Sequence, residues 1–239
     1  MKRVSTLPWK RALAILLAVP ALALAAEGFR LDKSPHNPHD VASLQAGART
    51  YVNYCLGCHG VQYMRYQGLT ELGLSEAQIK DNLLFAGEKV GEPMKTVQDP
   101  KQAKGWFGVA PPDLSVVSRS RGADWLYTYL RTFYRDAKTP TGWNNAVFPN
   151  VAMPHALWML QGERGWDAKQ HSFTEISKGS QSPAQYDATV RDLVNFLVYV
   201  GEPAATDRKV IGIAVLFVLL IVLFPLTYWL KKEFWKDVK

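Results

Sequence analysis

Cysteine is almost absent from this chain of 239 residues, which contains only two. Two cysteines exclude a small scaffold held together by several disulfides, and they also exclude a metal site built from four thiolates. Internal repeats and low-complexity tracts are lacking as well. The fractions of hydrophobic residues (48%) and charged residues (21%) are those of ordinary globular proteins, so a disordered or collagen-like chain is excluded.

Excess basic charge is absent from the central part of the sequence, although the whole chain has a formal net charge of +7. Lysine and arginine gather in the first eleven residues and again after residue 207. Between Glu27 and Asp207, 18 basic residues stand against 19 acidic ones, which leaves a net charge of −1. We therefore expect no nucleic-acid partner, and membrane targeting explains both basic clusters.

An uncharged run of thirteen residues, 12–24, follows the basic N-terminus and leads into small residues in an Ala-x-Ala pattern. The run is too short to span a bilayer, and the pattern is typical of a secretory signal peptide, which we expect over residues 1–26. An uncleaved anchor helix is the alternative. In either case the chain that follows is exported, and in a bacterium residues 27–207 would stand in the periplasm.

A second uncharged run covers twenty-one residues, 210–230, near the C-terminus. A helix of about 20 residues crosses the hydrocarbon core of a bilayer, so we expect a single transmembrane anchor helix over residues 208–231. A buried core helix is the alternative. Four lysines follow the run, whereas only Arg208 and Lys209 immediately precede it, and this asymmetry favours a cytoplasmic tail at residues 232–239.

Helical periodicity is clear in three segments of the exported part, whereas the alternation typical of strands is weak throughout. The expected helices run from Asp40 into Cys55, over residues 123–136, and from Ser182 to Gly201. Asp40 and Ser182 are suited to cap the first turns of their helices. Long connections rich in Gly, Pro and Asn lie at residues 86–122 and 138–181. Because loops of this length usually line something functional, we expect a mainly α domain wrapped around a large cofactor.

Both cysteines stand in one motif, Cys55-Leu56-Gly57-Cys58-His59. The pattern Cys-x-x-Cys-His is the attachment site of c-type haem. Residues at i, i+3 and i+4 share one face of a helical turn, so the two thiols can bond the two vinyl groups while the imidazole of His59 comes under the iron. The motif therefore predicts one covalent haem c.

Three other uses of this motif are weaker. A thioredoxin-like dithiol lies near a βαβ pattern, which this sequence lacks, and would gain nothing from His59. A zinc site needs a fourth ligand and usually a second pair of ligands. A structural disulfide is disfavoured by the tight loop between the two cysteines.

The ligand opposite His59 decides whether such a haem transfers electrons or binds small molecules. Met153 is the best candidate, because two prolines stiffen the loop that carries it. Met94 is the second candidate, and Met64 is too near His59 in the sequence to reach the other haem face easily. An open position would instead favour a peroxidase or a gas sensor. The histidines that could take the place of methionine are His36, His39, His155 and His171.

Several further stretches accompany the haem motif. In chain order they are Met64-Arg65-Tyr66, Pro-Pro-Asp-Leu-Ser at residues 111–115, Arg119 to Arg121, Met153-Pro154, residues 195–199 and residues 201–203. Together with the single C-terminal anchor, these stretches resemble cytochrome c1, the haem subunit of the quinol:cytochrome c oxidoreductase (bc1) complex. The resemblance covers nearly the whole chain after the signal. Trp125 departs from it, since relatives commonly carry Tyr near this position.

The resemblance implies a c-type cytochrome domain, mainly α, with long loops around one covalent haem and one C-terminal transmembrane helix. The residues that it implies at the haem are Cys55, Cys58, His59, Met153, Tyr51, Pro112 and Arg121. Of these, His59 and Met153 are the expected axial ligands, and Arg121 is expected to face a propionate. Without the resemblance, Arg121 is a solvated loop charge.

The resemblance also implies that one electron passes from the Rieske iron–sulfur protein to a soluble cytochrome c, beside cytochrome b in the membrane. The chain itself would be an electron-transfer subunit that forms and breaks no bond. An anchored monohaem cytochrome that serves a terminal oxidase or a photosynthetic reaction centre is the alternative. Glu88, Glu92 and Asp99 could attract a basic cytochrome c, although exposed charges are usually solvated surface.

Overall fold

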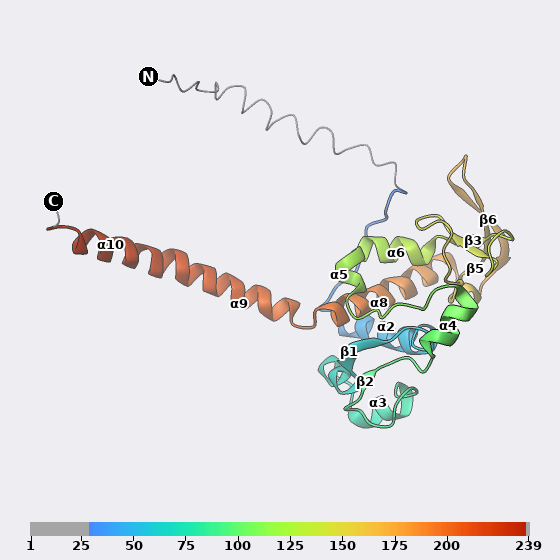
Figure 1. Cartoon of the computed structure of the whole chain (residues 1–239), viewed down its shortest axis with the longest axis horizontal. Coiled ribbons are helices and arrows are strands. Elements are labelled where there is room, and N and C mark those ends of the chain that lie inside the picture. The colour runs from blue at the N-terminus through green and yellow to red at the C-terminus, as the bar shows by residue number, and fades with distance from the viewer. Residues whose placement is uncertain (1–28, 238–239) are drawn as a thin grey trace, which may run out of the picture. The chain divides into compact units, whose positions relative to one another are not determined.

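The computed structural model describes residues 29–237, so the expected signal peptide at residues 1–26 lies outside the described residues. The chain first forms α2 (Val41–Tyr54), β1 (Val61–Arg65), the 3₁₀-helix η2 (Tyr66–Leu72), α3 (Glu76–Asn82), β2 (Pro93–Met94), α4 (Pro100–Phe107), α5 (Val117–Arg121) and α6 (Ala123–Arg131). It continues with β3 (Phe133–Arg135), β4 (Trp143–Asn145), α7 (Trp158–Gln161), β5 (Gly162–Asp167), β6 (Ser172–Lys178) and α8 (Pro183–Gly201). The last elements are α9 (Ala205–Phe217), the π-helical turn η3 (Val218–Leu223) and α10 (Phe224–Phe234) (Figure 1).

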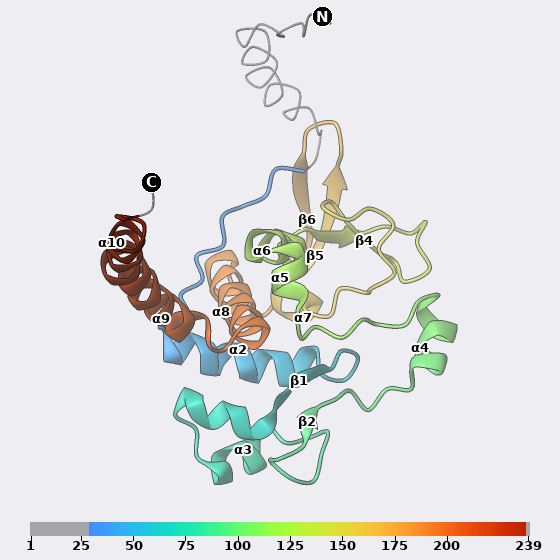
Figure 2. The ribbon, with the colours of Figure 1, turned by 60° about the vertical axis from the view of Figure 1, so that its left-hand side comes forward.

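Helices α2 and α8 lie side by side and form the centre of the core (Figure 2). Both were predicted, and both begin as predicted. The Asp40 side chain accepts a hydrogen bond from the Ser43 backbone N–H at 3.0 Å. Ser182 forms a capping box with Gln185, and Pro183 occupies the first turn. These caps satisfy backbone N–H groups that have no partner within the helix, which confirms both helix starts.

Gly47 permits the close approach of α2 and α8. A Cβ atom at this position would lie 2.0 Å from the backbone oxygen of Asp192 and 2.7 Å from the Cβ of Phe196. Polar bonds cross the same contact, because the Ser43 hydroxyl donates to the Asp192 carboxylate at 2.7 Å and the Asn195 amide donates to the Ser43 hydroxyl at 3.0 Å. Since α2 leads directly into the cysteine motif, this contact positions the motif against the core.

Helix α6 ends at Arg131, so the prediction of a helix up to residue 136 was wrong at its C-terminal end. The Thr132 hydroxyl donates to the backbone oxygen of Thr128 at 2.9 Å, and such local bonds often accompany a helix end. The next residues pair as β3 with β4, which takes their backbone groups out of the helix. Tertiary pairing therefore overrides the helical pattern here.

Strands β5 and β6 form an antiparallel hairpin inside the segment 138–181, which the sequence predicted as a loop. Apart from Gly162, the residues of both strands are half-buried or exposed, so no buried face imposes alternation on the sequence. The rings of Trp166 and Phe173 lie 4.5 Å apart across the pair and stabilise it. The other long connection, 86–122, likewise contains short elements, among them α4 and α5.

The helix Asp207–Phe234 is the one helix of residues 29–237 that is long and apolar enough to cross a membrane. Its most apolar stretch has a mean hydropathy of 3.0 and is not buried against the rest of the chain. Pro225 lacks a backbone N–H, and the turn before it widens, because the Phe224 N–H donates to the Leu219 oxygen. The predicted anchor at residues 208–231 lies within this helix.

We predict that Gly47→Ala destabilises the domain by about 1–3 kcal/mol, because the added methyl group forces α2 and α8 apart. The thermal midpoint of the full-length protein in detergent should fall by several degrees. Gly105→Ala is the matched control, since a Cβ there meets no atom within 4 Å on the surface of α4. An unchanged midpoint for Gly47→Ala would mean that the two helices can separate without loss of packing.

Candidate functional site

A cavity of about 100 Å³, open to solvent at its mouth, brings together three segments that are distant in the sequence. Its lining residues are Tyr54, Cys55, Cys58, His59, Phe107, Val109, Pro111, Pro112, Ala152, Met153, Pro154 and Ala156. Most of these side chains are apolar, as is usual for the site of a small molecule or cofactor. Five of the seven residues expected at the haem therefore line one cavity.

The cysteine motif continues the helical path of α2 for one more turn. The backbone N–H groups of Cys58 and His59 donate to the Cys55 oxygen at 3.0 and 2.8 Å. This turn directs the side chains at i, i+3 and i+4 to the same side, as the motif predicts. The two cysteines do not form a disulfide with each other, and Cys55 is buried whereas Cys58 is exposed.

The electrostatics of the two thiols do not suit a redox-active dithiol. Burial, and next the neighbouring Cys58, raise the pKa of Cys55 to about 12. Burial also raises the pKa of Cys58. Thiol oxidoreductases need the opposite shift, because the thiolate is the reacting form. The environment therefore argues against the thioredoxin-like alternative.

His59 is held in the tautomer that a metal ligand requires. Its Nδ1 lies 2.7 Å from the Pro112 backbone oxygen, and since an oxygen of this kind only accepts, Nδ1 carries the proton and Nε2 has a free lone pair. Burial lowers the pKa of His59, while the bond to Pro112 and the nearby Asp113 oppose this shift. The imidazole is therefore neutral at neutral pH and able to bind iron.

The segment after Pro112 is fastened to the motif by its own hydrogen bonds. The carboxylate of Asp113 accepts from the backbone N–H groups of Gln62 and Ser115 at 3.0 and 2.9 Å. The Leu114 N–H donates to the Gly60 oxygen at 2.8 Å. These bonds give the Pro-Pro-Asp-Leu-Ser stretch a physical role, because they hold the backbone oxygen that orients His59.

Tyr51 does not line the cavity but supports it from the core. Its side chain is fully buried, and its hydroxyl donates to the His59 backbone oxygen at 2.6 Å. Its ring lies 5.6 Å from that of Phe196 on α8. Tyr51 therefore connects the packing of the two central helices with the backbone of the motif.

Met153 reaches the cavity on a loop that two buried asparagines hold in place. The side-chain oxygen of Asn145 accepts from the N–H groups of Val147 and Phe148 at 2.9 and 3.0 Å, and its amide donates to the Tyr129 backbone oxygen at 2.8 Å. Asn144 accepts from the N–H of residue 150 at 2.8 Å, where the backbone is left-handed. Sequence reasoning missed both asparagines, whose only signal was an Asn-Asn pair before the Met153 loop.

Tyr129 is a further residue that sequence reasoning missed. Its hydroxyl donates to the Met153 sulfur at 3.4 Å, and burial raises its pKa, so the hydroxyl stays protonated. Its ring stacks on Trp125 at 4.7 Å, and the guanidinium of Arg121 lies 5.1 Å from the Trp125 ring. Arg121 itself does not line the cavity, and its role at a propionate stays a prediction.

The other candidate ligands lie elsewhere. Met94 and Met64 are buried in the core, and Met159 is exposed. His155 is buried, bonds Gln161 at 2.8 Å and stacks on a phenylalanine ring, and burial lowers its pKa to about 3. In the part of the chain that the structure describes, His59 and Met153 are the one histidine and the one methionine on the cavity. No group of three His, Cys, Asp or Glu side chains that could hold a metal ion is found within residues 29–237.

The residues on the cavity fit the donor set of a c-type haem. The apolar cavity is lined by two thiols on one turn, a neutral imidazole and a thioether. The Nδ1 atom of this imidazole bonds the Pro112 backbone oxygen. These features define a c-type cytochrome site.

Comparison with known proteins agrees with this class. The model of the Cytochrome C1 family matches residues 31–238, so the chain belongs to the cytochrome c1 family. It is 45% identical to cytochrome c1 of Allochromatium vinosum, over 94% of this chain and 96% of that one. It is 48% identical to a protein of Nitrosomonas europaea named ammonia monooxygenase gamma subunit, over 95% and 96% of the two chains. A chain of a hyperthermophilic respiratory Complex III matches with a TM-score of 0.45 and 15% identity, over 97% and 100% of the two chains.

Membership of the family identifies an electron-transfer haem protein with a mainly helical fold. It also implies a haem of the c type, as the sequence motif does. The resemblance stated from the sequence is thereby confirmed.

We predict that Asn145→Ala loosens the Met153 loop and destabilises the domain. The change leaves the part-buried backbone N–H groups of Val147 and Phe148 without their partner, at about 1–3 kcal/mol for each group that water cannot reach. The loss in the free energy of unfolding should be at least about 1 kcal/mol, measured by denaturant titration. Asn53→Ala is the control, because that exposed amide bonds only the Arg49 oxygen on the surface of α2. Equal stabilities of the two variants would contradict the anchoring role.

Proposed function

We propose that this chain is the membrane-anchored monohaem cytochrome of a bc1 complex. It takes one electron from the Rieske iron–sulfur protein and passes it to a soluble cytochrome c, beside cytochrome b. Cys55 and Cys58 would bond one haem covalently, and His59 and Met153 would bind its iron. The observation that carries the proposal is the single apolar cavity that joins Met153 to the cysteine motif.

The bound haem supplies one-electron transfer by the change between ferrous and ferric iron. The chain's own residues tune this change. The thioether of Met153 is a weak donor, and the apolar lining excludes water, so both favour the less charged ferrous state and raise the potential. The bond from His59 to Pro112 fixes the imidazole in one orientation. No side chain needs to move a proton in this reaction.

The proposed location follows from the two ends of the chain. A signal peptide at residues 1–26 would export residues 27–207, and the helix at 208–231 would anchor them to the cytoplasmic membrane. The haem domain then stands in the periplasm, and the tail at 232–239 is cytoplasmic. This arrangement brings the cavity to the compartment where a soluble cytochrome c moves.

We predict that Met153→Ala keeps the covalent haem but lowers its midpoint potential markedly, because a weak sulfur donor is lost. Redox titration of the full-length protein measures the shift. Met159→Ala is the matched control, since that methionine is exposed and lies off the cavity. If both variants keep the parent potential, Met153 is not a ligand.

We predict that Tyr129→Phe lowers the potential in the same direction by a smaller amount. The hydroxyl draws electron density from the Met153 sulfur, and its loss makes the sulfur a better donor to ferric iron. Tyr127→Phe on the same helix is the control, because its hydroxyl does not bond the sulfur. If Tyr127→Phe shifted the midpoint potential as much as Tyr129→Phe, the effect would belong to α6 as a whole and not to the bond with the Met153 sulfur.

We predict that the protein purifies from mild detergent with cytochrome b and a Rieske protein, and that quinol reduces its haem only through this assembly. Isolation without these partners would favour the alternative, an anchored cytochrome that serves a terminal oxidase or a reaction centre. Rapid binding of cyanide or carbon monoxide by the native protein would indicate an open iron position. That result would favour a ligand-binding or oxygen-activating role instead.

A further inference from the structure

Three exposed lysines lie on the segment that supplies one wall of the cavity. Lys101 and Lys104 are exposed on α4, and Phe107 at the end of the same helix lines the cavity. Because residues three apart share a helix face, Lys104 lies next to Phe107, and Lys101 lies one turn further along. Lys95 is also exposed, and the hydroxyl of the next residue, Thr96, donates to the oxygen of Gly57 inside the cysteine motif at 2.8 Å.

Acidic groups offset these lysines only in part. No ion pair is found for them in residues 29–237. The acid nearest to them in the chain, Asp99, accepts the Lys101 backbone N–H and caps α4. The carboxylate of Asp113 accepts from two backbone N–H groups and keeps its negative charge, so residues 95–113 contain three lysines and two acids. Residues 54–60 and 141–162, which supply the other walls, contain no Asp, Glu, Lys or Arg.

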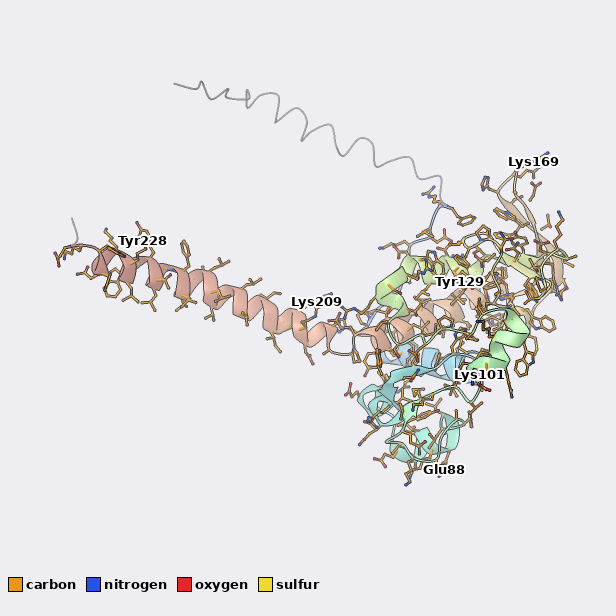
Figure 3. The ribbon with its side chains drawn as sticks, viewed as in Figure 1. Glu88, Lys101, Tyr129, Lys169, Lys209 and Tyr228 are labelled. Atoms are coloured by element: carbon orange, nitrogen blue, oxygen red, sulfur yellow. The ribbon has the colours of Figure 1, made fainter. Side chains whose placement is uncertain are left out.

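Glu88 and Glu92, two of the acids that could attract a basic cytochrome c, do not lie on the segments that line the cavity. The carboxylate of Glu92 lies 3.3 Å from the backbone nitrogen of Glu88, so both belong to the loop between α3 and β2. Figure 3 places Glu88 at the end of the lobe built from α3 and β2, away from Lys101. Neither acid belongs to the cavity lining or to the segment that carries it. A basic partner therefore finds little to attract it at this mouth.

Large apolar side chains are exposed on the segments that line the cavity. Trp106 is 65% exposed beside Phe107, and Val109 is 57% exposed although it lines the cavity. On the opposite wall, Trp158 is 45% exposed, two residues after the lining residue Ala156. Protein interfaces commonly have such an apolar centre with aromatic anchors and a charged rim.

We propose that this mouth docks a soluble electron carrier whose own face is acidic around an apolar centre. The proposal rests on the function proposed above and specifies the chemistry of the soluble partner. Lys95, Lys101 and Lys104 attract the carrier over a long range, and the exposed Trp106 contacts its apolar centre. The contact brings the partner to the open side of the cavity, where the path for the electron is shortest.

The test measures the second-order rate of electron transfer from the reduced, full-length complex to two soluble cytochromes c. One probe carries an acidic docking face and the other a basic one, and both rates are followed over a range of ionic strength. The acidic probe should react faster at low salt and slow down as salt rises, because salt screens an attraction. The rate with the basic probe should stay low or rise with salt.

Two sets of variants assign the effect to the mouth. Lys101→Glu with Lys104→Glu should lower the low-salt rate with the acidic probe about tenfold or more and abolish its salt dependence. Lys138→Glu with Lys169→Glu changes the net charge equally on two other loops, and Figure 3 places Lys169 away from Lys101. This control pair should change the rate by less than about twofold. Trp106→Ala should lower the rate at every ionic strength without changing the salt slope.

The proposal would be overturned if the rate with the basic probe fell as salt rose and increased in the Lys101→Glu, Lys104→Glu variant. Equal rates in the mouth variant and the control pair would overturn it as well. Both results leave the proposed function intact, provided that quinol still reduces the haem. If the haem is never reduced within the complex, the proposed function fails instead.

Discussion

The hydrogen bond from Nδ1 of His59 to the Pro112 backbone oxygen is the interaction on which the site depends. It selects the tautomer, orients the ring and leaves Nε2 free on the cavity side. The Pro112 oxygen stays in position because Asp113 and Leu114 bond the backbone that follows the motif. From the core, Tyr51 fixes the His59 backbone oxygen. The Pro112 segment and Tyr51 thus hold the cysteine motif and the residues after it by hydrogen bonds within the protein.

The opposite wall of the site, the Met153 loop, is held by side-chain hydrogen bonds to its backbone. The Met153 loop has little regular structure, and its backbone N–H groups are satisfied by Asn144 and Asn145 in place of a strand or helix. Tyr129 then holds the sulfur itself. The role proposed for Met153 as an iron ligand requires such support, because a mobile thioether would spend much of its time away from the metal.

The sequence was most informative where the interactions are local. Helices α2 and α8, their caps and the one-turn geometry of the cysteine motif depend on residues a few positions apart, and all were predicted. The end of α6 and the hairpin of β5 and β6 depend on strand pairing between segments. A strand without a buried face shows no alternation of apolar and polar residues, so the sequence did not indicate the hairpin. Tyr129 and Asn145 could not be predicted as parts of the site, because only the fold brings them to the Met153 loop. The same holds for the position of Arg121 over Trp125.

The proposed function depends on a haem bonded covalently to residues 55 and 58, and the mass of the denatured polypeptide tests this most directly. We predict that the mass exceeds that of the mature amino-acid chain by one haem, and that the peptide containing Cys55 and Cys58 carries the whole increase. A mass equal to that of the polypeptide alone, with the pigment lost on denaturation, would contradict it.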